Sequence, residues 1–334
     1  MLKPETGVRL SIIEDHYNKF TEDKRLLTRR GNVEFTVSMK YIHECLRLLE
    51  NESENLGKKY LNAAQECDSD AVAEAHDDAS EISCDGDAQT SGDAASIALG
   101  DDVRTRDGAA SRMKIIDIGA GTGRYSITLA EEGYDVTAVE LVKYNLGIMK
   151  AKIRDNKNRE NLKIKAVQAD ALNLKKFNDD SFDMALLFWP MYHLYSFEDR
   201  LRALLEARRV VKKDGFVLVA YLMNEYSLLT YAFKEDHLDE CLRTGRITED
   251  YHIISDEADI YSYVRLEDMT RLVQAAGMSR YKVISPDGPA SYLRPDINSW
   301  SEEKYRRFVD YQLKNCERPE LLGAGAHAVD ILIK

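Results

Sequence analysis

The residues best suited to ligand chemistry lie in one glycine-rich turn, Asp117-Ile-Gly119-Ala-Gly121-Thr-Gly123. An apolar run, MKIIDI, precedes the turn, and the helix-like stretch RYSITLAEEG follows it. Glycine has no Cβ, so it allows a sharp turn and lets the backbone approach a ligand closely. At the start of a helix, backbone N–H groups also face anionic groups. The pattern therefore predicts a pocket of the nucleotide-binding type between a strand and a helix.

The spacing of the glycines argues against two common kinds of nucleotide ligand. A dinucleotide fingerprint needs G-x-G-x-x-G, or Ala in the last place. Counted from Gly119 and Gly121 the last place is Arg124, and counted from Gly121 and Gly123 it is Ser126. The sequence also contains no Gly-Lys-Ser or Gly-Lys-Thr phosphate loop. NAD, FAD and nucleoside triphosphates are therefore disfavoured.

The elements around this turn alternate between strand and helix patterns. Apolar stretches bounded by turn residues predict seven strands, at 113–118, 134–141, 162–170, 182–188, 216–222, 281–285 and 328–333. Helical patterns occur at 124–133, 197–211, 266–276 and 302–315. The sequence KKDG should end the second of these helices and Gly277 the third. This order predicts parallel βαβ units and an α/β fold.

An amphipathic helix is predicted ahead of these elements. Its apolar side chains recur at four-three-four-three spacing, at Phe35, Met39, Ile42, Leu46 and Leu49. Arg29 and Arg30 stand just before this helix. They form either a solvated pair or a contact for an anionic substrate.

An acidic, low-complexity segment separates this helix from the first strand. Residues 51–110 hold 15 Asp and Glu against 4 Lys and Arg, so they carry almost all of the formal net charge of −12. No aromatic residue occurs between positions 62 and 110. Such a composition cannot bury enough apolar surface to offset the entropy of ordering. We expect a disordered insertion that is either a solvated spacer or an acidic interaction segment.

Composition and charge exclude several classes of protein. Outside the acidic segment the chain is nearly neutral, without the basic excess of a dedicated nucleic-acid binder. The five cysteines form no C-x-x-C pair, so we expect them to be reduced and without a metal. No stretch is apolar enough to span a membrane, and the first residues show no secretory signal. The expected protein is soluble and cytoplasmic.

Acidic residues stand at regular places after the glycine turn. The turn itself reads IIDIGAGTG, Glu140 lies 17 positions after Gly123 at the end of the second strand, and Asp170 follows the third. With DSFDMALLF and KKDGFVLVAYL, this set resembles the class I methyltransferases that use S-adenosylmethionine, closely over residues 111–224. The resemblance implies a three-layer Rossmann-like sandwich with a helical cover. Its sheet should have seven strands and be mainly parallel, with the last strand antiparallel.

The resemblance also implies roles in binding the cofactor, which is a sulfonium cation with an amino-acid tail. Asp117 would complement the positive charge, and the carboxylate of Glu140 would accept two ribose hydroxyls. Leu141 or Val142 would pack on the adenine face, and Asp170 would lie near the adenine. The implied cofactor-binding residues are Asp117, Gly119, Ala120, Gly121, Gly123, Glu140, Leu141, Asp170, Ala171 and Phe188. No metal ligand is expected.

The loops after the fourth and fifth strands, WPMYHLYSFED and YLMNEYSLLTYAF, should line the acceptor site, because ligands bind beyond the carboxyl ends of such strands. Enzymes that methylate amino groups of nucleobases commonly place Asn or Asp, two prolines and an aromatic residue after the fourth strand. The sequence Trp189-Pro190-Met191-Tyr192 lacks the amide or acid and the second proline, which argues against that activity. The Tyr-His-Leu segment at 192–194 instead resembles a bacterial branch of the family that typically has glycine in place of Trp189.

His193 and Tyr192 are the candidate catalytic residues. His193 could act as a general base or orient an acceptor, or it could cap or pack under the following helix. Tyr192 belongs to a group of tyrosines that would form either an aromatic wall or half-buried core. His327, before the last strand, has no recognisable constellation around it. A base is not obligatory, since positioning alone contributes about 7 to 11 kcal/mol to such a reaction.

We therefore predict an S-adenosylmethionine-dependent methyltransferase acting on a small-molecule acceptor. The alternatives are a protein or RNA methyltransferase and a non-catalytic domain that binds the cofactor. Neither nucleic acid nor a membrane is an expected partner. The expected organisation is a helical segment covering the active site at 1–52, the acidic insertion at 53–110, the cofactor-binding core at 111–224, and a substrate-covering segment with the last two strands at 225–334.

Overall fold

The computed structural model describes residues 12–14, 16, 28–51 and 112–334. The acidic insertion predicted at 53–110 lies outside the described residues, and so does most of the chain before Thr28. None of the helices in the described ranges has both the length and the apolar character needed to cross a membrane.

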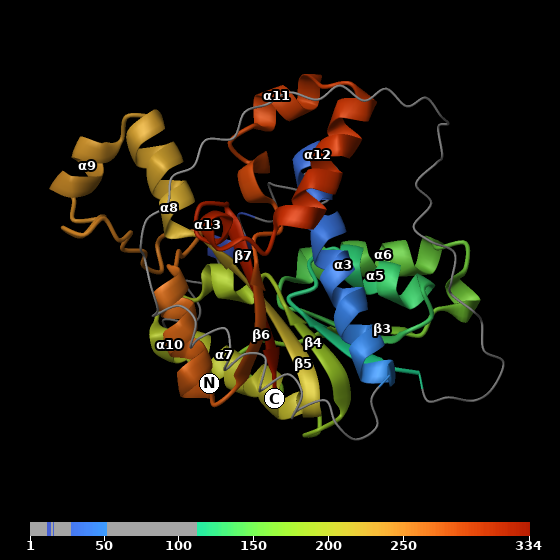
Figure 1. Ribbon diagram of the computed structural model, residues 1–334. Coiled ribbons are helices and arrows are strands. Elements are labelled where there is room, and N and C mark those ends of the chain that lie inside the picture. Colours follow the sequence, from blue (N-terminus) through green and yellow to red (C-terminus); the bar gives the residue numbers. More distant parts are fainter. Residues whose placement is uncertain (1–11, 15, 17–27, 52–111) are drawn as a thin grey trace, which may run out of the picture.

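A seven-stranded sheet with the order β3-β2-β1-β4-β5-β7-β6 forms the centre of the molecule (Figure 1). Its strands are β1 (Lys114–Ile118), β2 (Asp135–Glu140), β3 (Ile164–Gln168), β4 (Phe182–Leu187), β5 (Val211–Leu222), β6 (Ser279–Ile284) and β7 (His327–Ile333). Strands β1 to β5 pair in parallel, whereas β7 runs antiparallel to both β5 and β6. The predicted seven-stranded, mainly parallel sheet with an antiparallel last strand is thus confirmed.

Helices cover both faces of this sheet, so the strands are apolar on both sides. On β4, Met184 and Leu186 pack in one apolar cluster, and Ala185 and Leu187 pack in another cluster on the opposite face of the sheet. Figure 1 shows the resulting three layers. The first face carries α3 (Arg29–Asn51), α5 (Arg124–Glu131) and α6 (Lys143–Asp155); the second carries α7 (Phe197–Val210) and α10 (Leu266–Ala276).

The remaining helices, apart from η2 (Arg159–Asn161), which leads into the start of β3, surround the edge of the sheet at which β1 to β5 end. They are η3 (Pro190–His193), α8 (Asn224–Ser227), the π-helix η4 (Leu228–Lys234), α9 (Leu238–Arg243), η5 (Gly288–Ala290), α11 (Arg294–Ser299), α12 (Glu302–Asn315) and α13 (Pro319–Leu322). Tyr305 of α12 packs in one cluster with Val33 of α3, so α12 lies against the first turns of α3. The segment from α8 to α9 projects away from the sheet (Figure 1).

The four helices predicted after the glycine turn are all present, and local signals account for their ends. The side chain of Ser196 caps α7 by accepting a hydrogen bond from the N–H of Asp199 at 3.1 Å. Ser301 caps α12 in the same way. Gly277 ends α10 in the left-handed conformation, with φ of +61°.

Three local predictions were wrong. The KKDG sequence does not separate helix from strand, because β5 begins at Val211, directly after α7. Asp214 has a φ of +62° and lies within β5. The residues after β5 form α8 and η4 rather than a loop. Arg29 and Arg30 lie in the first turn of α3 rather than before it, and Arg29 Nη1 donates to the carbonyls of Ile297 and Trp300 at 3.0 and 2.5 Å. Arg29 therefore ties α3 to the α11 region.

Candidate functional site

The glycine turn after β1 has a backbone that only glycine adopts readily. Gly119, Gly121 and Gly123 have φ values of +79°, +57° and +88°. A Cβ on Gly119 would lie 2.6 Å from Cδ of Pro190, so the turn is closely packed against the residues that follow β4. No atom lies within 4 Å of the equivalent position on Gly121, which borders an open cleft. The turn thus exposes bare backbone to a ligand.

Glu140, the last residue of β2, holds this turn in place. Its Oε2 accepts a hydrogen bond from the N–H of Gly121 at 2.8 Å, and its Oε1 accepts one from the N–H of Val142 at 2.7 Å. Glu140 is 5% exposed, and burial raises its pKa to about 7 although the two backbone hydrogen bonds act in the opposite direction. Further donors, such as ligand hydroxyls, would stabilise its ionised form.

Asp117 lies beneath the turn. Its Oδ2 accepts a hydrogen bond from the hydroxyl of Ser126 in α5 at 2.5 Å, which links the end of β1 to the start of that helix. Burial raises the pKa of Asp117 to about 6, although the Ser126 hydrogen bond lowers it. Asp117 is not among the residues that line the cleft. Its contact with α5 supports the shape of the turn.

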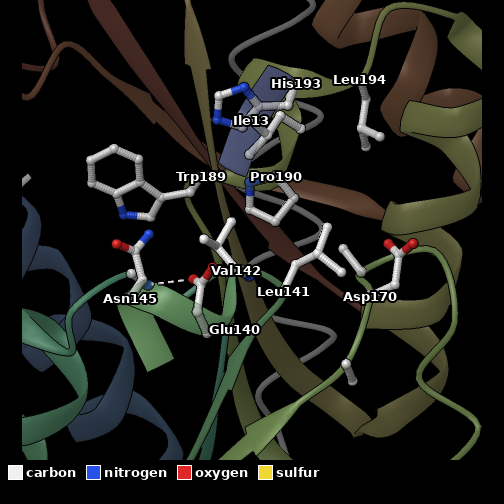
Figure 2. A pocket seen from close by; sticks show the side chains of 14 residues that line it. Ile13, Glu140, Leu141, Val142, Asn145, Asp170, Trp189, Pro190, His193 and Leu194 are labelled. Carbon is white, nitrogen blue, oxygen red and sulfur yellow. Dashed lines mark hydrogen bonds between the residues drawn. The ribbon is translucent and has the colours of Figure 1, made fainter. Parts of the chain in front are cut away.

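The cleft lies at the carboxyl ends of β1 to β4 and encloses about 620 Å³ including its open mouth (Figure 2). Six of the predicted cofactor-binding residues line it, namely Gly119, Gly121, Glu140, Leu141, Asp170 and Ala171. The other lining residues are Ile13, Val142, Asn145, Ala169, Trp189, Pro190, His193 and Leu194. Ala120, Gly123 and Phe188 are buried nearby and do not line it.

The chemistry of the cleft suits a nucleoside. Leu141 and Val142 present apolar side chains next to the carboxylate of Glu140, and Asp170 lies on the far side of Leu141 in Figure 2. One oxygen of Asp170 accepts the N–H of Leu172 at 2.9 Å, which fixes the carboxylate at the end of β3. A flat apolar ring fits between such walls, and a hydroxyl pair can donate to Glu140.

A second cavity, which we call the aromatic chamber, adjoins the cleft and encloses about 640 Å³ including its open mouth. It is lined by Arg30, Trp189, Tyr192, Leu222, Met223, Tyr226, Ser227, Tyr261, Tyr263, Ala326 and His327. Trp189 lines both cavities, so its side chain forms part of the boundary between them. The chamber therefore lies where an acceptor could meet a ligand held in the cleft.

The two candidate catalytic residues lie in different cavities. His193 lines the cofactor cleft, where its Nδ1 donates to the carbonyl of Ile260 at 2.7 Å and its ring stacks on Tyr261 with 5.7 Å between centroids. Tyr192 lines the aromatic chamber, with its ring centroid 5.8 Å from that of His327. The structure does not bring His193 and Tyr192 together around one acceptor.

Sequence reasoning missed several residues of both cavities. Asn145 is buried in the cleft wall, and Ile13 closes the cleft from the N-terminal part of the chain. In the chamber, His327 contacts Asp287, with 3.1 Å between Nδ1 and Oδ2. The antiparallel direction predicted for the last strand was the available signal, because it places the first residue of β7 at the ligand-binding edge.

Known proteins are similar to the segment that contains most of the cleft residues. A family model described as a methyltransferase domain matches residues 116–219. The glycine/sarcosine N-methyltransferase of Aphanothece halophytica is 30% identical over 125 residues, which are 37% of this chain and 45% of that protein. The enzyme of the same name from Parasynechococcus marenigrum is 30% identical over 106 residues, 31% of this chain and 36% of that protein. The chain thus spans less than half the length of either relative.

Among solved structures, the chain is similar to a SAM-dependent methyltransferase from Methanosarcina mazei, with a TM-score of 0.46 and 16% identity over 67% of this chain and 93% of that one. The family match spans β1 to most of β5, and therefore includes the glycine turn, Glu140 and Asp170. Residues 116–219 accordingly resemble a methyltransferase domain.

Proposed function

We propose that the chain transfers the methyl group of S-adenosylmethionine to the amino group of a small molecule. The observation that carries this proposal is the pair of adjoining cavities at one edge of the sheet, one with the features of a nucleoside site and one lined by aromatic rings. Trp189 borders both, so two ligands held there would meet at its side chain.

The cleft residues fit S-adenosylmethionine. The buried carboxylate of Glu140 would accept hydrogen bonds from the ribose hydroxyls, which would favour its charged form and offset its raised pKa. Leu141 and Ala171 would pack on the adenine, and the backbone at Gly119 and Gly121 would face the amino-acid tail. When bound, S-adenosylmethionine supplies a methyl group on a positively charged sulfur.

The residues of the two cavities would contribute mainly by positioning. A well-oriented pair of reactants gains about 7 to 11 kcal/mol relative to the same groups free in solution. The cleft would fix one reactant through the turn and Glu140, and the chamber would hold the other against Trp189.

The walls of the aromatic chamber support an amine as the acceptor. An ammonium group is attracted to the faces of aromatic rings, and the chamber is bordered by Trp189 and four tyrosines. Among the described residues, Arg30 makes no ion pair with a carboxylate, and its Nη1 donates to Ser291 Oγ at 3.1 Å. Arg30 is thus placed to bind a carboxylate of the acceptor. The names of the two curated relatives, both N-methyltransferases of amino acids, agree with this proposal.

Two measurements on the full chain test the proposal. Calorimetry should show binding of S-adenosylhomocysteine and no binding of NADH, which needs a different glycine spacing. Incubation with S-adenosylmethionine and glycine, sarcosine, phenethylamine or tyramine should then release S-adenosylhomocysteine in the presence of one of the amines.

The possible outcomes separate the alternatives. Binding of NADH without S-adenosylhomocysteine would contradict the assignment of the cleft. Binding of S-adenosylhomocysteine without transfer to any of the amines would retain the cofactor site and reject the amine acceptor. Methylation of RNA or of a protein fraction under the same conditions would favour a macromolecular acceptor instead.

A further inference from the structure

The fold brings a histidine and an aspartate together at the back of the aromatic chamber. His327 is the first residue of β7, opposite Leu222 at the carboxyl end of β5, because β7 runs antiparallel to that strand. Asp287 lies in the loop after β6, which also ends at this edge of the sheet. The two residues are 40 positions apart in the sequence and form a buried contact.

Asp287 contacts His327 through both of its carboxylate oxygens. Its Oδ2 lies 3.1 Å from the ring Nδ1, and its Oδ1 accepts the backbone N–H of His327 at 3.1 Å. The side chains of His327 and Asp287 are only 6% and 1% exposed. The hydroxyl of Ser291 donates to Asp287 Oδ2 at 2.9 Å, and Arg30 donates to that hydroxyl. Asp287 is thereby fixed on three sides.

This arrangement sets the tautomer of the imidazole. A carboxylate accepts hydrogen bonds, so Nδ1 of His327 carries a proton and the neutral ring has its lone pair on Nε2. The ring borders the aromatic chamber and also the small cavity between α3 and Phe188. A histidine oriented in this way by a buried aspartate is the arrangement that general-base catalysis requires.

We infer that His327 is the general base of the acceptor site and that Asp287 positions it. This inference rests on the proposed transfer to an amine. An amine is bound as an ammonium at neutral pH and has no lone pair until it loses a proton, so a base in the chamber has a defined task. The ammonium proton passes to Nε2 of His327, and Nδ1–H stays on Asp287.

The transfer then balances without further reagents. The nitrogen lone pair forms the bond to the methyl carbon, and the carbon–sulfur bond breaks with its electrons remaining on sulfur. The imidazolium of His327 subsequently releases its proton to water. No oxidant, reductant or metal is consumed.

Titratable groups from three elements face His327. Glu34 of α3 places Oε2 3.9 Å from Nδ1, Asp287 comes from the loop after β6, and Tyr192 comes from η3. Arg30 of α3 acts through Ser291. Among the described residues, no group of His, Cys, Asp and Glu side chains has the arrangement of a metal site.

The test compares pH profiles of methyl transfer by the full-length protein and by His327→Gln, with whichever panel amine reacts. The wild type needs both the neutral imidazole and the bound ammonium, so kcat/KM should rise and then fall with pH. His327→Gln has to bind the free amine, so kcat/KM should rise along one limb that follows the ionisation of the amine. At pH 7 its kcat should fall about 100- to 10,000-fold.

Two further variants separate catalysis from folding. Asp287→Asn retains acceptors for Ser291 but loses the charge that orients the imidazole, and we expect a loss of about 10- to 100-fold in kcat with little change in KM. His43→Gln is the matched control, because His43 also pairs with a carboxylate, Glu132 at 2.8 Å, but lies outside both cavities. His43→Gln should keep the wild-type profile.

Every outcome decides between the two proposals. A two-limbed profile in the wild type that becomes single-limbed in His327→Gln, with S-adenosylhomocysteine binding intact, supports the inference. An unchanged profile or a loss below tenfold in His327→Gln, in a protein that methylates an amine, overturns the inference alone. A wild type that methylates no amine, or that does not bind S-adenosylhomocysteine, would instead overturn the proposed function and the inference with it.

Discussion

The cofactor cleft and the aromatic chamber occupy one edge of the same sheet, yet they are assembled in different ways. The cleft takes Gly119, Glu140 and Asp170 from the ends of three strands that follow one another in the sequence. The chamber is lined by residues from distant parts of the chain, which include Arg30 of α3, Leu222 of β5 and His327 of β7. A site at consecutive strand ends is readable as short motifs, whereas a site made by distant segments depends on the topology.

The buried carboxylates near the two cavities also differ in their partners. Asp117 and Glu140 make no ion pair within the described part of the chain, and burial raises the pKa of both. In the chamber, Asp287 faces an imidazole and, through Ser291, a guanidinium. The cleft therefore holds carboxylates that would gain from a ligand with donors, and the chamber holds groups that can exchange a proton.

The largest effect on cofactor binding is expected from Gly119→Ala, which alters the cleft and not the chamber. The new Cβ would require a left-handed alanine and would lie 2.6 Å from Pro190 Cδ. Together these cost about 2 to 5 kcal/mol. Calorimetry should show S-adenosylhomocysteine binding weakened by about 30-fold or more, with a lower Tm.

Gly147→Ala is the matched control for that substitution. Gly147 lies within α6, and its Cβ position has no atom within 4 Å. Alanine there should stabilise the helix by about 0.5 to 1 kcal/mol and leave binding unchanged. Equal losses in both variants would mean that the turn has no special role.

Removal of the Glu140 carboxylate should have the next largest effect. Glu140→Ala loses the hydrogen bonds to Gly121 and Val142 as well as those to ligand hydroxyls. We expect a loss of about 1.5 to 3 kcal/mol, or about 10- to 150-fold in affinity for S-adenosylhomocysteine. An unchanged dissociation constant would show that Glu140 serves the turn but not the ligand.

The pH dependence of cofactor binding follows from the same residue. Ribose hydroxyls favour the ionised carboxylate, so with a pKa of about 7 the affinity should fall about tenfold between pH 8 and pH 6. The stability of the ligand-free protein should depend on pH in the opposite direction. Because the folded-state pKa is raised, the contribution of Glu140 is most favourable below about pH 4.5 and is lost as the pH rises through 7. Glu140→Gln should remove both dependences, as measured by calorimetry and thermal unfolding.

Most of the fold and most of the cleft could be predicted from the sequence, because the signals are local. Apolar runs fixed the seven strands, and a glycine turn with acids at two later strand ends located six cleft residues. The extension of β5 back to Val211 escaped prediction because Lys212 and Lys213 are exposed at the sheet's rim and carry no apolar pattern. The helical nature of α8 and η4 was missed for lack of a regular period.

The contact between His327 and Asp287 could not be predicted from local sequence signals. Neither residue belongs to a motif, and their approach depends on β7 lying between β5 and β6 with reversed direction. The prediction of an antiparallel last strand contained this information, but using it required the register as well. Residues contributed by the last strand are therefore visible only once the strand order is known.

A smaller effect is expected from Arg30→Met, which acts on the chamber alone. If Arg30 binds a carboxylate of the acceptor, its loss removes a charged hydrogen bond of about 1.5 kcal/mol and should raise KM for sarcosine about tenfold. KM for phenethylamine, which has no carboxylate, should not change. Arg154→Met removes an exposed arginine paired with Asp155 and should leave both values unaltered. Equal increases for the two amines would assign Arg30 a structural role.

The smallest effect is expected from His193→Gln, in the wall of the cleft where its ring stacks on Tyr261 of the chamber. His193 donates to the carbonyl of Ile260 and stacks on Tyr261, so it braces the wall between cleft and chamber. Glutamine can still donate to that carbonyl but cannot stack in the same way, and the loss should be about 2- to 10-fold in kcat/KM. Because the proton is expected on His327, the two-limbed pH profile should persist in His193→Gln. A single rising limb in His193→Gln, with a two-limbed profile retained in His327→Gln, would move the base from the chamber to the cleft and reverse the division of roles between them.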